Sequence, residues 1–359
     1  MEPRQRRITP RRALFPSAAA VLLLLAASFA PPPAPAGEAE LPAPVESGIS
    51  FLLSRQREDG AIAAAESRKF DVWETVEALT AIASWKTNAY LASAPPVRKA
   101  LDFLRFWEDG GGMLLHRSGR RGEYCLETSA EYCRLLGRLE SRGIGVSESA
   151  DRVAQRIRGL QPPAGGWDLG NSAVPRGRRN YPSVTGFALR ALADRGLSPL
   201  RSRAALEFLS RTFREEGNWG SDPYYYGTPF YALAPILSAL GSRPGGAEVD
   251  ALRDRARNFI FSVQTPDGGF SFASVRDPSG PSEQLETALA LRALLGSGLD
   301  SRDPRIRRAL SWLLNRQEAD GSWAGGRFPA PGGSRLKRED VYCTAQVLQV
   351  LADCPGAVP

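Results

Sequence analysis

The sequence predicts an all-α fold, an (α/α)6 toroid built from six helical-hairpin repeats. A glycine turn recurs six times, at intervals of 51–54 residues. An amphipathic segment precedes each turn, and a more apolar segment that starts near a Thr follows it. One hairpin cannot bury its own apolar face, so the repeats must pack against one another. No polar capping repeat is evident at either end, which favours a closed ring over an open solenoid.

The turn has the same pattern in each repeat. A Gln or an aromatic residue comes first, a Gly follows four residues later, and a large apolar residue stands two positions beyond the Gly. The six copies are Gln56–Ile62, Trp107–Met113, Gln161–Trp167, Phe213–Trp219, Gln264–Phe270 and Gln317–Trp323. Gly adopts the left-handed conformation that other residues resist, and the apolar residue is expected to close over the end of the preceding helix.

Two helices are expected in each repeat. Segments 97–104 and 307–314 illustrate the first helix, with apolar residues at helical spacing. The second helix begins near a repeated Thr and is more apolar, so it should line the inside of the ring. The six Thr residues are Thr75, Thr128, Thr185, Thr228, Thr287 and Thr344.

The N-terminus has the pattern of a signal peptide over residues 1–36. A basic stretch ending at Arg12 precedes an apolar run over residues 18–30, and small-residue cleavage sites end at Ala30 and Ala36. Residues 37–45 are expected to be a linker and residues 46–354 the toroid. We expect export to the periplasm, the cell surface or the medium, with membrane contact only through this N-terminal segment. An uncleaved anchor is the alternative, although the run is short for a membrane span.

Charge and cysteine content exclude several classes of function. Residues 1–30 hold five Arg and one Glu, and so carry +4 of the net charge of +7. The remainder, about +3, has no basic block for a phosphate backbone, so no nucleic-acid partner is expected. Cys125 and Cys133 lie eight residues apart on one expected helix, about 12 Å along its axis, which is too far for a disulfide. Each Cys is expected to be a small buried apolar residue.

The motif Gln-x-x-x-Gly-x-Trp before an apolar helix resembles the repeat of squalene–hopene cyclases, terpene cyclases and protein prenyltransferase β subunits. The resemblance covers about residues 46–354. It implies outer helices first in each pair, and chemistry at the N-terminal ends of the inner helices, near the six Thr.

The resemblance also allows the family's catalytic motifs to be sought in this sequence. Polyene cyclases carry Asp-x-Asp-Asp-Thr, in which the middle Asp is the protonating acid. The nearest segment is Glu283–Thr287, where Leu285 stands in place of that acid. In the first repeat, segment 71–75 has Trp73 there.

The zinc site of the prenyltransferases would fall on Glu283, Leu285 and Cys343 in the same register. Leu cannot bind zinc, and two remaining ligands are too few for a typical site. The single His, His116, is expected to be a loop residue rather than a ligand or part of a catalytic triad. We therefore expect no metal and no cofactor.

Carboxylates and aromatic residues near the Thr positions are the candidate site. If the ring closes, they converge on one mouth of the lumen. The candidate catalytic residues are Glu286, Glu283, Glu74, Glu127 and Asp71. The candidate binding residues are Trp73, Tyr124, Tyr224, Tyr226, Tyr342 and Asp340. The alternative for the Glu residues is electrostatic, because a carboxylate in the first turn of a helix favours the helix dipole.

Three functions remain open from these residues. The first is a ligand-binding toroid whose lumen takes an isoprenoid or a glycan. The second is an enzyme, either an isoprenoid cyclase or transferase or a polysaccharide-degrading enzyme that uses lumen carboxylates. The third is a non-catalytic scaffold that binds proteins on its rim. An apolar lumen would favour isoprenoids, a polar cleft with paired carboxylates would favour glycans, and a packed lumen would favour the scaffold.

Overall fold

A computed structural model describes residues 41–64, 70–116, 122–170, 180–220, 228–241, 246–272, 283–325, 340–354 and 356. Residues Glu40–Pro359 form one compact unit, to which these residues belong. The predicted signal peptide and residues 37–40 of the predicted linker lie outside the described residues, as do Tyr224 and Tyr226. The rest of the predicted linker is described, and its last three residues already belong to the first helix, which begins at Ala43.

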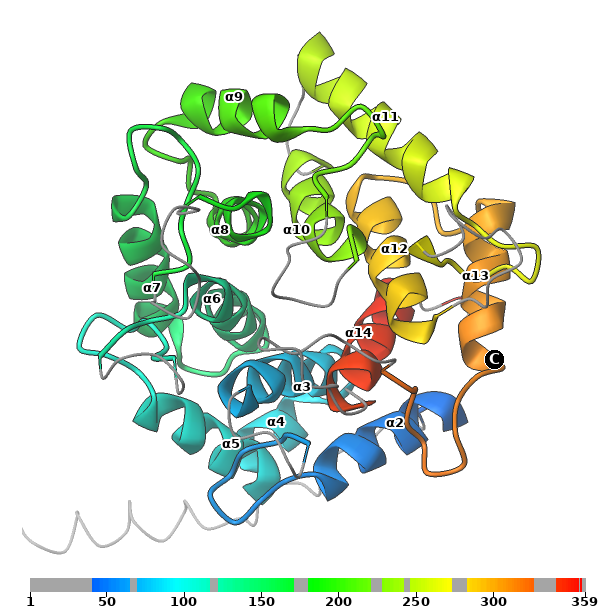
Figure 1. Cartoon of the computed structure of the whole chain (residues 1–359). Helices are drawn as coiled ribbons and strands as arrows, with labels where there is room; N and C mark the ends of the chain where they lie inside the picture. Colours follow the sequence, from blue (N-terminus) through cyan, green and yellow to red (C-terminus); the bar gives the residue numbers. More distant parts are fainter. Residues whose placement is uncertain are drawn as a thin grey trace, which may run out of the picture. The chain divides into compact units, whose positions relative to one another are not determined.

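Six inner helices close into a ring within the unit Glu40–Pro359 (Figure 1). They are α3 (Asp71–Trp85), α6 (Leu126–Ser141), α8 (Pro182–Asp194), α10 (Phe230–Gly241), α12 (Gln284–Gly296) and α14 (Asp340–Asp353). Each packs against the next along the chain, and α14 packs against α3. The predicted toroid, with the apolar second helix of each repeat inside, is confirmed.

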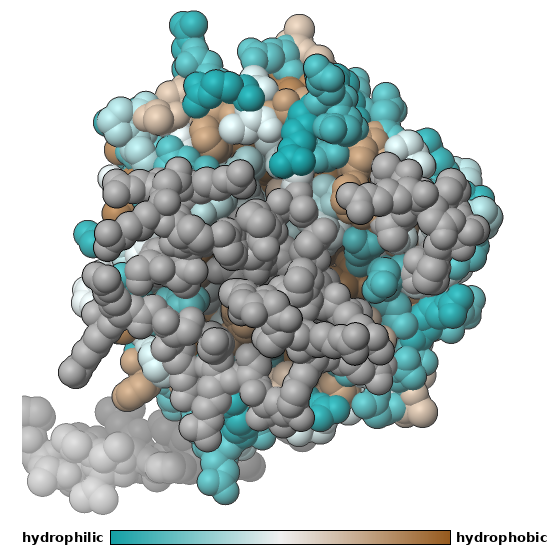
Figure 2. Space-filling model, viewed as in Figure 1, coloured by the Kyte–Doolittle hydropathy of each residue, from teal (hydrophilic) through white to brown (hydrophobic). Residues whose placement is uncertain are grey.

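The first helix of each repeat lies outside this ring (Figure 1). The outer helices are α2 (Ala43–Ser54), α5 (Pro95–Phe106), α7 (Ser147–Gly159), α9 (Ser202–Thr212), α11 (Ala247–Ser262) and α13 (Pro304–Leu314), with a short α4 (Asn88–Ser93) before α5. They are amphipathic: α5, for example, buries Val97 and Leu104 and exposes its charged face. The periphery of the molecule in Figure 2, where the outer helices lie, is accordingly mostly hydrophilic. The described residues contain isolated β-bridges at the turns but no strand.

The repeated Gln joins neighbouring repeats. The Nε2 of Gln56 donates to the carbonyl of Gly60 at 3.1 Å and to that of Pro96, at the start of the next outer helix, at 2.8 Å. Gln317 of the sixth repeat donates to Gly321 at 2.9 Å and to Pro44 at 2.8 Å. Because Pro44 belongs to α2, the first outer helix, this last bond closes the ring.

The repeated Trp closes over the outer helix, as expected. The indole nitrogens of Trp167 and Trp323 donate to the carbonyls of Ile157 and Leu313, at 2.9 and 2.8 Å. Both acceptors lie in the last turn of the preceding outer helix. Both indoles are fully buried, so the turn both ends the helix and contributes to the core.

The predicted register of the second repeat is wrong by one residue. The glycine with positive φ is Gly112 (φ 85°), not Gly111. The turn pairs Glu108 with Leu114, where the first repeat pairs Gln56 with Ile62. Glycines stand at 110, 111 and 112, so the sequence alone could not fix which of them takes the left-handed conformation.

All four cysteines are buried and none forms a disulfide, as predicted. None of the helices in the described part of the chain has the length and apolar content of a membrane-spanning segment.

Candidate functional site

The repeated Thr fastens the turn to the inner helix. In Thr75, Thr185, Thr287 and Thr344 the hydroxyl oxygen accepts the backbone N–H of the large apolar residue of the turn. Thr75 accepts from Ile62 at 3.0 Å, and Thr287 accepts from Phe270 at 2.8 Å. Each of these Thr residues is fully buried. Its role is therefore to hold the turn in place, in agreement with a structural reading of the motif.

The Glu before the Thr holds the next part of the same loop. Glu74 Oε2 accepts the N–H of Ala64 at 2.7 Å, and Glu286 Oε2 accepts the N–H of Phe272 at 2.8 Å. In both repeats the donor stands two residues after the apolar residue of the turn. These two carboxylates therefore occupy equivalent positions, as predicted, and each has a backbone partner.

Replacing Glu286 by Gln tests whether burial of this carboxylate reduces stability. Burial raises the pKa of Glu286 despite the bond from Phe272. A raised folded-state pKa means that ionisation favours unfolding, so this penalty develops as the pH rises through the unfolded pKa and is complete above the folded one. In urea unfolding, the free energy of unfolding of Glu286→Gln should therefore equal that of the wild type at about pH 3.5 and exceed it at about pH 8.

Glu46→Gln is the control, because Glu46 is an exposed Glu in the first turn of α2. At about pH 8 the free energy of unfolding of this variant should be lower than that of the wild type by about 0.3–1 kcal/mol, because only the interaction with the helix dipole is lost. A similar loss of unfolding free energy in Glu286→Gln at that pH would contradict the claim that burial of the Glu286 carboxylate reduces stability.

The other predicted site residues at the starts of the inner helices have different surroundings. Asp71 is fully buried and pairs with Arg57 at 2.5 Å. Asp340 Oδ1 accepts the N–H of Gly325 at 3.0 Å. Glu283 is exposed. Tyr124 is half-buried and its ring lies against Gly170, where an added Cβ would lie 2.1 Å from the ring. The structure thus ties Asp71 and Asp340 to neighbouring groups at the helix starts.

Glu127 is in a different register from Glu74 and Glu286. In the second repeat Ser129 takes the place of the Thr: its Oγ accepts the N–H of Leu114 at 2.9 Å and donates to Cys125 O at 2.7 Å. Glu127 therefore stands two residues before the hydroxyl, not one. The prediction that it shares the register of the other two Glu residues is wrong, for the same reason as the glycine shift.

Glu127 points into the ring. Its side chain accepts the hydroxyl protons of Ser183 at 3.2 Å and of Tyr231 at 3.2 Å. The residue is 2% exposed. Its two donors belong to α8 and α10, so its carboxylate joins three inner helices inside the lumen.

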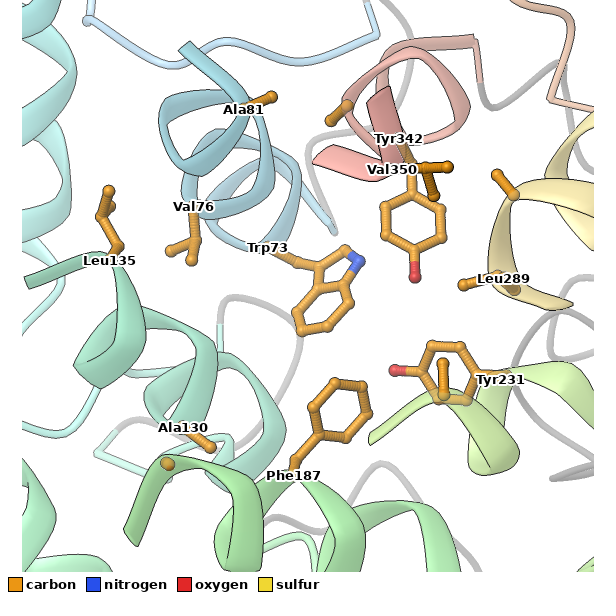
Figure 3. Close-up of a cluster of buried hydrophobic side chains, with 14 of the residues drawn as sticks. Trp73, Val76, Ala81, Ala130, Leu135, Phe187, Tyr231, Leu289, Tyr342 and Val350 are labelled. Atoms are coloured by element: carbon orange, nitrogen blue, oxygen red, sulfur yellow. The ribbon is translucent and has the colours of Figure 1, made fainter. Parts of the chain in front are cut away.

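Four aromatic side chains meet in the lumen beside this carboxylate (Figure 3). Trp73 lies 5.7 Å from Phe187 and 5.7 Å from Tyr342 between ring centroids, and Phe187 lies 5.5 Å from Tyr231. They come from α3, α8, α10 and α14, and all are buried. We call these four residues the aromatic floor. Trp73 and Tyr342 were predicted site residues, and the structure brings them together.

Polar groups of the floor face its middle. In Figure 3 the hydroxyls of Tyr231 and Tyr342 and the indole nitrogen of Trp73 point toward a common space. Within the described residues the buried N–H of Trp73 has no hydrogen-bond acceptor. Burial raises the pKa of Tyr342 well above its usual value, so the phenol remains a proton donor. The indole N–H of Trp73 can therefore donate a hydrogen bond, while the rings of the floor offer apolar contact.

A second layer of buried polar groups lies within the ring. Glu77 Oε2 accepts from Gln346 at 2.8 Å and from Gln349 at 2.9 Å. Gln346 in turn accepts from Arg292. Burial and the nearby Glu131 raise the pKa of Glu77. Sequence reasoning missed this layer, although charged residues within apolar inner helices were a visible signal.

No group of three His, Cys, Asp or Glu residues within the described ranges could hold a metal ion. Cys343 is fully buried, and burial raises the pKa of its thiol well above the usual value. A thiol held in that form is a poor ligand.

Comparison with known proteins agrees with this geometry. The family model of the squalene-hopene cyclase C-terminal domain matches residues 178–344. A probable squalene–hopene cyclase of Sinorhizobium fredii is 30% identical over 227 residues, which cover 54% of this chain and 34% of that protein. The squalene–hopene cyclase of Alicyclobacillus acidocaldarius is 27% identical over 326 residues, which cover 81% of this chain and 48% of that protein.

Solved structures share the fold over most of the chain. The type II terpene cyclase MstE from Scytonema superposes with a TM-score of 0.65 at 18% identity, covering 88% of this chain and 98% of that one. The family model, the sequence matches and the solved structures together support the terpene cyclase superfamily for this chain. A protein from Actinoplanes has a TM-score of 0.66 at 21% identity, covering 87% of this chain and 98% of that one. At these identities the solved structures establish the superfamily fold alone.

The chain spans a third to a half of the length of the squalene–hopene cyclases that it matches. Two floor residues, Phe187 and Tyr231, were absent from the predicted site. They stand two and three residues after the repeated Thr185 and Thr228, whereas the prediction considered only positions before the Thr. Considering also the positions in the first helical turn after each repeated Thr would have found these two residues.

Proposed function

We propose that the protein binds an isoprenoid in the lumen of its toroid, against the aromatic floor. The observation that carries the proposal is the meeting of Trp73, Phe187, Tyr231 and Tyr342 from four inner helices. Aromatic walls contact branched apolar chains over a large area at a small cost in entropy. A glycan site would need free carboxylates, whereas Glu74 and Glu286 each accept a backbone N–H of a turn.

The relatives support the same class of ligand. Those matched in sequence include squalene–hopene cyclases, and one solved MstE structure contains geranylgeranyl dihydroxybenzoate. The indole N–H of Trp73, which has no acceptor among the described residues, adds a place for an oxygen atom of the ligand. An isoprenoid with an oxygenated end therefore fits better than a pure hydrocarbon.

Equilibrium dialysis with labelled geranylgeraniol tests this proposal. We expect saturable binding of one molecule per chain, and a loss of about tenfold or more in Trp73→Leu, because one buried hydrogen bond and one aromatic contact disappear. Trp85→Leu is the matched control: Trp85 ends the same helix α3 and donates to Leu348 O at 2.9 Å. Equal losses in both variants, or saturable binding of cellohexaose instead, would overturn the proposal.

A second candidate function is proton-initiated cyclisation of the bound chain, with Glu127 as the acid. The observation that favours it is the register of Glu127, two residues before the hydroxyl of Ser129. In the Asp-x-Asp-Asp-Thr motif the protonating acid holds that position relative to the Thr. The carboxylic acid would add its proton to an alkene carbon, and the faces of the floor would stabilise the resulting carbocation.

We also propose that the chain is exported, on the basis of its N-terminal pattern. N-terminal sequencing of the mature protein should begin after Ala30 or Ala36, and an intact Met1 would contradict it.

A further inference from the structure

A cavity of about 370 Å³ lies at the C-terminal ends of the inner helices. The aromatic floor uses residues near the N-terminal ends of α3 and α14, so the cavity lies toward the other end of the ring. Its lining includes the last residues of α8 and α14 and the end of α12. The charged side chains that line it are Arg134, Arg190, Arg292, Asp194 and Asp353.

The three guanidinium groups have unequal partners. Arg134 donates to Glu131 at 2.7 Å and to Asp194 at 2.6 Å, so its charge is compensated. Arg190 has only a 3.8 Å contact with Glu131 and, within the described part of the chain, no hydrogen bond. Arg292 donates to the neutral amide of Gln346. Arg190 and Arg292, which belong to different helices, therefore line the cavity with guanidinium N–H groups that can still donate hydrogen bonds.

The long contact with the buried Glu131 accounts for Arg190 only in part. Cations at the C-terminal end of a helix can bond to its last carbonyls, but Arg190 makes no such bond among the described residues. Its side chain is 12% exposed, and at that depth the 3.8 Å contact with Glu131, a carboxylate that it shares with Arg134, compensates its charge only in part. Burial and repulsion from Arg134 and Arg292 lower its pKa to about 9. Asp353, the other carboxylate of the lining, is exposed.

We infer that this cavity binds a phosphate group between Arg190 and Arg292. A guanidinium presents parallel N–H groups that match the oxygens of phosphate. The cavity has space for a phosphate together with a small ester substituent or several waters. Ser301 in the lining offers a hydroxyl group to one of the remaining oxygens. The site is separate from the isoprenoid site proposed above and does not depend on it.

Titration calorimetry of the full chain with inorganic phosphate, at constant ionic strength set by chloride, tests the inference. Saturable binding is expected in the wild type, and about tenfold or weaker binding in Arg190→Gln, because a charged donor pair is lost. Arg203→Gln is the control: Arg203 lies on outer helix α9 with its side chain 93% exposed, and its loss should leave binding unchanged. Glycerol 3-phosphate in a parallel titration distinguishes a phosphate ester, which would bind more tightly, from free phosphate.

Ser301→Glu keeps the inference testable if Arg190→Gln does not fold. The new carboxylate would sit in the cavity in place of the anion, so this variant should melt at a higher temperature than the wild type and no longer bind phosphate. The inference is overturned if the wild type shows no saturable binding of either phosphate, or if Ser301→Glu binds phosphate as the wild type does.

Discussion

Replacing Gly321 by Ala is expected to lower the free energy of unfolding by about 2–5 kcal/mol. Gly321 has φ 86°, and a Cβ there would lie 2.4 Å from the carbonyl oxygen of Ser47. Part of the loss comes from the left-handed conformation, about 1–2 kcal/mol. The rest comes from forcing the turn of the sixth repeat away from α2, the first outer helix. Urea unfolding measures the sum.

Gly143→Ala separates these two effects. Gly143 has φ 78°, but no neighbouring atom lies within 4 Å of an added Cβ. Its replacement should therefore cost about 1–2 kcal/mol, from conformation alone. The difference between the two variants reports the close approach of the last repeat to the first. Equal losses would mean that the ring is not closed at this point.

Glu127→Gln is expected to abolish turnover if the chain cyclises its ligand. The variant keeps an acceptor oxygen for one of the two hydroxyls, of Ser183 and Tyr231, but has no acidic proton to give to an alkene. General acid catalysis contributes about 10²–10⁴-fold, so product formation from geranylgeraniol should fall by at least that factor. Mass spectrometry of products formed in deuterated water gives a direct readout, because the wild-type product should carry one added deuterium.

Glu207→Gln is the control for that experiment. Glu207 lies on outer helix α9 with its side chain 56% exposed, and its replacement should leave turnover unchanged. Retention of full turnover by Glu127→Gln would remove Glu127 as the acid. Absence of turnover in the wild type would leave ligand binding as the function and reject cyclisation.

The architecture could be predicted from the sequence because its determinants are local. The Gln, the Gly and the large apolar residue of each turn contact one another within a few residues, so their spacing repeats along the chain. The error in the second repeat arose where Gly110–Gly112 offered three equivalent choices. Choosing Gly112 there also moves the hydroxyl position to Ser129, which changes the interpretation of Glu127.

The site was harder to predict because its contacts join distant repeats. Trp73 and Tyr342 could be placed from their register, but nothing in the sequence pairs Trp73 with Phe187 more than 100 residues away. The backbone partners of Glu74 and Glu286 were hidden in the same way, since a carboxylate before a helix can serve the dipole, a ligand or a loop. Arg190 and Arg292 become neighbours of one cavity only when the ring closes.

Photolabelling tests most directly whether an isoprenoid occupies the lumen. The probe is a geranylgeraniol analogue with a diazirine on its chain, followed by digestion and mapping of the labelled peptides. The proposed function predicts labels on peptides that contain Trp73, Phe187 and Tyr342, and their loss when unlabelled geranylgeraniol competes. Labels confined to the outer helices, or labels that competitor does not reduce, would contradict a ligand site against the aromatic floor.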